Sequence, residues 1–66
     1  MKITLRAARV NKGYTQAKLA EMMNTTRQTI QNYENGKTSP RYEIIRRLAL
    51  ILDIDIDNIE MPKRKK

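Results

Sequence analysis

Residues 15–36 read TQAKLAEMMNTTRQTIQNYENG, and this stretch decides the fold. Thr15 has the side chain of a helix N-cap and precedes a helix predicted over residues 16–23. Asn24 tolerates the left-handed backbone that a sharp helix exit requires, and the threonines after it can cap a second helix over residues 27–35. Two short helices joined by a tight turn are the pattern of a helix-turn-helix.

Three more helices are predicted around this stretch. The first of the chain spans residues 5–12 and ends at Gly13, and the fourth spans residues 40–52 after Ser39. A short fifth helix is predicted over residues 56–60. The inward face of the fourth helix is expected to comprise Tyr42, Ile45, Leu48, Ala49 and Leu52.

The predicted fold class is all-α. Residues 54–57, which read IDID, would also fit a strand, but a lone strand would have no partner. The sequence therefore predicts a compact five-helix domain without a sheet, with the helix-turn-helix at its second and third helices. The domain is expected to cover residues 1–60, and residues 61–66 are expected to form a mobile basic tail.

The composition excludes several classes of protein. The chain has 66 residues, enough for one small domain with a modest core. It contains no Cys and no His, which removes disulfides, thiolate nucleophiles, the commonest general base and most zinc ligands. We therefore expect no enzyme activity, metal, cofactor or small-molecule site. No apolar run approaches the roughly 20 residues that span a bilayer, and no signal-peptide pattern is present, so a cytoplasmic protein is expected.

The charge of the chain predicts an anionic partner. The net charge is +7 at neutral pH, and residues 1–47 carry ten Lys or Arg against three acidic residues. Residues 48–60 carry four acidic residues and no base, and they cancel the four basic residues of the tail. The surplus therefore surrounds the helix-turn-helix stretch. Nucleic acid, an anionic membrane surface or an acidic protein would each fit it.

The exposed side chains of the third helix suit double-stranded DNA. In a helix-turn-helix this helix enters the major groove, where amides match adenine and Arg matches guanine. The predicted base-reading residues are Arg27, Gln28, Gln31 and Asn32. The predicted phosphate contacts are Gln16, Thr26, Thr29, Lys37, Thr38 and Arg41, with exposed backbone N–H groups after Gly36 completing a clamp. The alternative is that these side chains are only a solvated helix face.

The sequence resembles the phage-repressor and Cro type of helix-turn-helix domain over residues 3–60. The resemblance is carried, in order, by TQAKLA (residues 15–20), RQTI (27–30), ENGK (34–37), Pro40, and Leu52 followed by IDI (54–56). It implies a small bacterial or phage transcriptional regulator, repressor-like and associated with the nucleoid. It also implies a homodimer on a pseudo-palindromic operator and a structural ion pair between Arg9 and Glu34. Ala8 and Asp53 depart from the pattern, because a larger aliphatic residue and a glycine are usual there.

Two questions about partners stay open at this stage. Ile44 and Ile51 lie off the inward stripe. Together with Leu50 and Met61 they form either a dimer seam or part of a broadly buried surface. The acidic, apolar segment 48–60 favours an alternative function, that of an antitoxin or phage accessory protein whose main partner is another protein. A membrane-surface peptide is disfavoured, because the fourth helix has a coherent core stripe.

Overall fold

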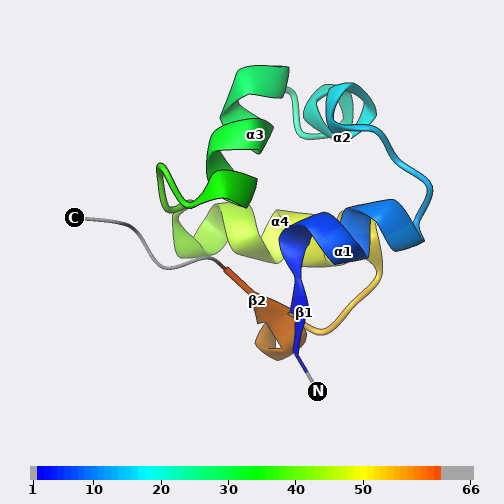
Figure 1. Ribbon diagram of the computed structural model, residues 1–66. Coiled ribbons are helices and arrows are strands. Elements are labelled where there is room, and N and C mark those ends of the chain that lie inside the picture. Colours follow the sequence, from blue (N-terminus) through cyan, green and yellow to red (C-terminus); the bar gives the residue numbers. More distant parts are fainter. Residues whose placement is uncertain (1, 62–66) are drawn as a thin grey trace.

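The computed structural model describes residues 2–61, and the predicted basic tail therefore lies, apart from Met61, outside the described residues. Four α-helices form most of the fold (Figure 1): α1 (Leu5–Asn11), α2 (Gln16–Met22), α3 (Arg27–Asn35) and α4 (Tyr42–Leu52). The remaining elements are the strands β1 (Ile3–Thr4) and β2 (Ile59–Glu60) and the 3₁₀-helix η1 (Ile56–Asn58). None of the helices in residues 2–61 is long and apolar enough to cross a membrane.

Threonine caps begin the first three helices. The hydroxyl of Thr4 accepts a hydrogen bond from the backbone N–H of Ala7 at 3.1 Å, and that of Thr15 accepts one from Lys18 at 3.0 Å. Thr26 does the same for Thr29 at 3.2 Å. Each bond satisfies one of the N–H groups that a helix leaves unpaired at its first turn. The caps set where α1, α2 and α3 begin.

Two non-glycine residues with left-handed backbone end α2 and α4. Asn24 has a φ of 56° just beyond the C-cap of α2, and Asp53 has a φ of 56° as the C-cap of α4. Short polar side chains tolerate this conformation better than other residues with a Cβ. Asn24 therefore turns the chain sharply from α2 into α3, and Asp53 turns it back from α4 toward η1.

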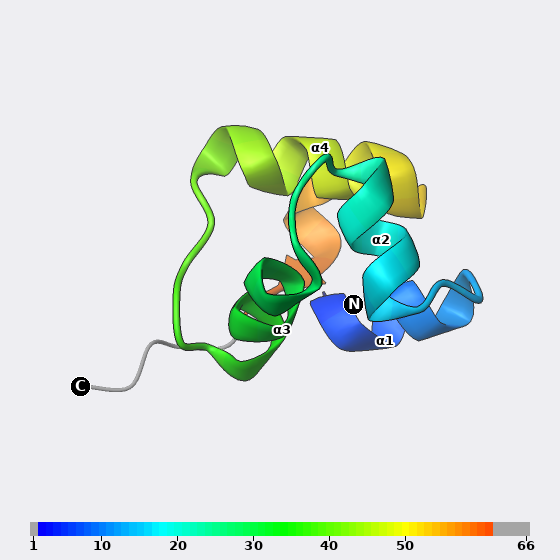
Figure 2. The ribbon, with the colours of Figure 1, turned by 90° about the horizontal axis from the view of Figure 1, so that it is seen from above.

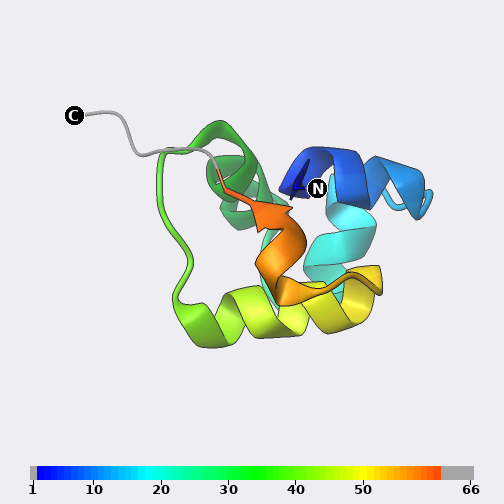
Figure 3. The same ribbon diagram turned by 90° about the horizontal axis from the view of Figure 1, so that it is seen from below.

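The prediction of five helices and no sheet is wrong at the end of the chain. The fifth helix is a single 3₁₀ turn, and Ile59–Glu60 continue as strand β2, which pairs in parallel with β1. The register places Ile3 opposite Ile59 and Thr4 opposite Glu60. Figure 3 shows η1 and β2 between α4 and the first residues of the chain. The sequence predicted no sheet because only residues 54–57 fit a strand and no partner for them is visible in the chain. The residues that pair are instead Ile3–Thr4 and Ile59–Glu60.

The predicted start of α4 is also wrong. The helix begins at Tyr42, and its N-cap is Arg41, which forms no side-chain capping bond. The buried residues of α4 lie in its C-terminal half, at Leu48, Ala49 and Leu52. Tyr42, in the first turn, is 65% exposed and does not belong to the inward face.

The core lies where the four helices meet (Figure 2). The largest fully buried side chains come from all four helices: Leu5, Leu19, Ile30, Leu48 and Leu52. Ala20 is also buried, and its small side chain lets α2 approach its neighbours closely. Ala8, smaller than the residue usual in the family that the sequence resembles, is buried in the same cluster. This core fixes α2 and α3 relative to α1 and leaves one side of α3 exposed.

Candidate nucleic-acid interface

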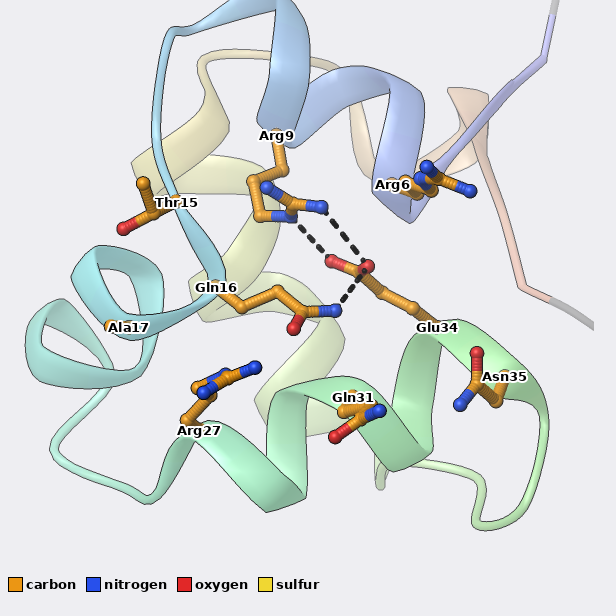
Figure 4. Close-up of a pocket in the computed structure, with 9 residues that line it drawn as sticks. All are labelled: Arg6, Arg9, Thr15, Gln16, Ala17, Arg27, Gln31, Glu34 and Asn35. Atoms are coloured by element: carbon orange, nitrogen blue, oxygen red, sulfur yellow. Dashed lines mark hydrogen bonds and ion pairs between the residues drawn. The ribbon is translucent and has the colours of Figure 1, made fainter.

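A hydrogen-bonded network centred on Glu34 joins α1, α2 and α3 (Figure 4). Arg9 Nε donates to Glu34 Oε2 at 2.6 Å, and Arg9 Nη2 donates to Glu34 Oε1 at 3.3 Å. Gln16 Nε2 donates to the same Oε1 at 3.0 Å, and Arg9 Nη1 donates to the carbonyl of Tyr14 at 2.8 Å. The side chains of Arg9 and Glu34 are only 11% and 3% exposed. The pair thus locks the orientation of α3 against α1.

The outward side chains of α3 include a pair of amides that bond to each other. Gln28 Nε2 donates to Asn32 Oδ1 at 3.0 Å, one helical turn apart. Gln28 is exposed, while Gln31 and Asn32 are half-buried. The bond leaves Gln28 with its carbonyl oxygen and one N–H, and this is the donor and acceptor set that matches adenine in the major groove. Asn32 therefore steadies the exposed side chain of Gln28.

Two shallow hollows flank α3. The first, about 600 Å³, lies between α1, α2 and α3, and among the residues predicted to contact DNA, Gln16, Arg27 and Gln31 line it. The second, about 530 Å³, lies beside the loop between α3 and α4. Its lining includes Thr29, Asn32, Thr38 and Arg41. Gln28 lines neither hollow. Successive residues of an α-helix are ~100° apart around its axis, so Gln28 projects between Asn35, which lines the first hollow, and Asn32, which lines the second. Gln28 therefore lies on a ridge of α3 between the two hollows.

Some of the predicted phosphate contacts have bonding partners within the domain. Gln16 bonds to Glu34, and the hydroxyls of Thr26 and Thr29 lie 2.8 Å apart. The backbone N–H groups of Lys37 and Thr38 both point to the carbonyl of Asn32, at 3.0 and 3.5 Å. The expectation that these N–H groups are exposed is therefore wrong. Lys37 and Thr38 are themselves exposed, and a phosphate contact there would have to use their side chains.

Arg6 is a candidate that the sequence-based reasoning missed. It lines the first hollow from α1, one turn before Arg9, and its side chain is exposed. The spacing of three residues between Arg6 and Arg9 places both on one side of α1, and this signal is visible in the sequence.

The residues predicted to form a dimer seam are only partly exposed to solvent. Ile44, Ile51 and Met61 are half-buried and pack against the core. Leu50, which the sequence grouped with these residues, is 80% exposed, and Tyr42, also on α4, is 65% exposed. Within residues 2–61, no group of three or more acidic side chains is arranged to hold a metal ion.

The proteins to which this chain is similar include three curated relatives. One is a prophage-derived, uncharacterized HTH-type transcriptional regulator of Bacillus subtilis, 36% identical over 80% of this chain and 49% of its own length. The others are multiprotein-bridging factors 1c and 1a of Arabidopsis thaliana, 30% and 40% identical over 85% and 79% of this chain. The matches cover 38% and 37% of those two plant proteins, so this chain spans half or less of the relatives.

The helix-turn-helix family model matches residues 5–59, which include all four α-helices. The match and the prophage-derived regulator agree with the helix–turn–helix geometry of α2 and α3. This chain therefore belongs to the helix-turn-helix family of the phage-repressor and Cro type.

Proposed function

We propose that this protein is a transcriptional regulator that binds double-stranded DNA in a sequence-specific manner and inserts α3 into the major groove. The observation that carries the proposal is the placement of Gln28 on an exposed ridge of α3 between two hollows. The major groove is bordered by two phosphate backbones, and only its floor carries base edges. A ridge with a hollow on each side is complementary to that shape.

In this mode of binding, the amides of α3 read bases and the flanking residues hold phosphates. Gln28, braced by Asn32, faces an adenine, and Gln31 reaches a neighbouring base. In the second hollow Arg41, Thr38 and Thr29 contact one backbone. Lys37, which precedes Thr38 in the same loop, adds a further contact. Gln16 and Thr26 contact the other backbone near the start of α3. Occupying promoter DNA would repress transcription without any chemical step.

Selection of bound sites from random duplex DNA tests this proposal. We expect an inverted repeat whose half-sites lie about one helical turn apart, because a homodimer with two-fold symmetry presents two copies of α3. Sedimentation with and without the selected duplex would show two chains per site. Failure to enrich any motif would contradict sequence-specific binding.

Gln28→Ala is expected to relax base preference at one or two positions of the selected site. The loss of binding free energy should be about 1–3 kcal/mol for the preferred site and much less for unrelated DNA, because the bonds that Gln28 makes to DNA are to base edges. Binding of both duplexes is measured at one fixed salt concentration. Asn11→Ala, which removes an exposed amide at the end of α1, is the matched control. Equal weakening on both duplexes by Gln28→Ala would contradict the base-reading role.

Binding to a small basic protein, as an antitoxin or phage accessory protein would bind its partner, is the second candidate function. Leu50 is 80% exposed, and the neighbouring Asp53, Asp55 and Asp57 are exposed acidic residues that complement a basic surface. Two relatives are named multiprotein-bridging factors. Purification from the native host should then yield a stoichiometric basic partner that Leu50→Glu releases. A preparation without such a partner would contradict this candidate.

A further inference from the structure

The residues that line the first hollow beside α3 carry a net positive charge. Three arginines line it, Arg6 and Arg9 from α1 and Arg27 from α3, and Glu34 is the one acidic residue among them. Arg9 and Glu34 neutralise each other through their short ion pair. Within residues 2–61, neither Arg6 nor Arg27 forms an ion pair or a side-chain hydrogen bond. Two unneutralised guanidinium groups therefore border one open depression.

The arrangement of these side chains differs from that of a base-reading surface. In Figure 4, Arg27 and Arg6 lie at opposite corners of the hollow, with Gln16 and the Arg9–Glu34 pair between them. Gln16 Nε2 has a second N–H besides the one directed at Glu34. Gln28, by contrast, does not line this hollow. Arg27 thus belongs to the flank of α3 and Gln28 to its ridge.

We propose that this hollow seats a stretch of one DNA backbone, with Arg27 and Arg6 each neutralising one of its phosphates and Gln16 donating a hydrogen bond between them. This inference rests on the proposed function, and it reassigns Arg27 from base reading to phosphate binding. It also adds Arg6, on α1, to the DNA-contacting surface. A guanidinium on the flank of α3 meets the wall of the major groove, where phosphates lie, before it meets base edges.

The test is the salt dependence of binding to a duplex of unrelated sequence, so that no operator has to be known. Arg6→Gln and Arg27→Gln should each reduce the slope of log affinity against log salt by about 0.9, because each removes one neutralised phosphate. The double variant should reduce it by about 1.8. Arg46→Gln, which removes an exposed arginine on α4 outside the hollow, should leave the slope unchanged. Circular dichroism of every variant checks that the helices are retained.

The charge-conserving variants separate phosphate binding from base reading. Arg27→Lys should keep the wild-type slope and base preference, because a lysine can still neutralise a phosphate as a point charge. A bidentate contact with guanine would be lost in the same variant. A wild-type slope in Arg6→Gln would overturn the proposal. So would a loss of base preference in Arg27→Lys.

The two proposals fail in different ways. If site selection enriches no motif but the slopes fall as expected, the hollow binds the backbone and sequence-specific regulation is wrong. If a motif is enriched and the slopes of Arg6→Gln and Arg27→Gln match the wild type, the regulatory function stands and the assignment of the hollow is wrong.

Discussion

Glu34→Ala is expected to destabilise the domain by about 3–5 kcal/mol, the cost typical of removing one partner of a buried ion pair. The substitution leaves the guanidinium of Arg9, which is 11% exposed, without its carboxylate. It also removes the acceptor to which Gln16 donates. A domain of this size has on the order of 3–10 kcal/mol of stability in total. Urea denaturation followed by circular dichroism should therefore show a large drop in the transition midpoint, or no folded baseline at all.

The exposed ion pair between Lys18 and Glu21 provides the control. It has an N–O distance of 3.3 Å, and its side chains are 55% and 76% exposed. Glu21→Ala removes a carboxylate of the same type, yet exposed pairs of this spacing contribute only about 0.2–0.5 kcal/mol. Similar losses in Glu34→Ala and Glu21→Ala would contradict the structural role of the network.

Leu48→Ala is expected to cost about 2–5 kcal/mol, because it removes a fully buried side chain and leaves a cavity at the meeting point of the helices. The range of this cost reflects how far the neighbouring side chains can relax into the cavity. Thermal unfolding measured by circular dichroism should show a markedly lower midpoint.

Leu50→Ala is the same substitution two positions further along α4, at a side chain that is 80% exposed. It should change stability by less than about 0.5 kcal/mol, the range usual for surface positions. Leu48→Ala with as little effect as Leu50→Ala would contradict the described orientation of α4. A large loss in Leu50→Ala would contradict it equally.

Much of the fold could be predicted from local signals. The caps Thr4, Thr15 and Thr26 and the turn residue Asn24 are recognisable because each acts within three or four residues along the chain. The mostly helical class is confirmed, with the helix-turn-helix at α2 and α3 as predicted. Asp53 also adopts the left-handed conformation expected of a residue in the usual place of glycine.

The strand pairing could not be predicted in the same way. Ile3–Thr4 and Ile59–Glu60 are two residues each, too short for any alternation to be visible. Their pairing depends on the path of all four helices between them. The predicted start of α4, at residue 40, was also wrong. Ser39 and Pro40 have the composition of a helix start, but the helix begins at Tyr42.

The candidate site was predictable in its residue types and less so in its bonding. The spacing of residues along α3 shows which side chains share a face. It does not show that Gln16 bonds to Glu34, or that Lys37 and Thr38 direct their N–H groups to Asn32. Those contacts cross between elements or depend on the local path of a loop. Arg6 was missed although its spacing from Arg9 is visible in the sequence, because most of its other neighbours in the hollow come from α2 and α3.

The parallel pairing of β1 with β2 has a consequence for folding during protein synthesis. Ile3 leaves the ribosome before the helices of the domain, and Ile59, its partner, emerges 56 positions later. α2 and α3 adjoin in sequence, so their contacts can form early, whereas a contact of such long sequence separation forms slowly. Nascent chains truncated before Ile59 should therefore resist protease less than chains that include it. The last strand would thus complete the domain only after nearly all of it has been translated.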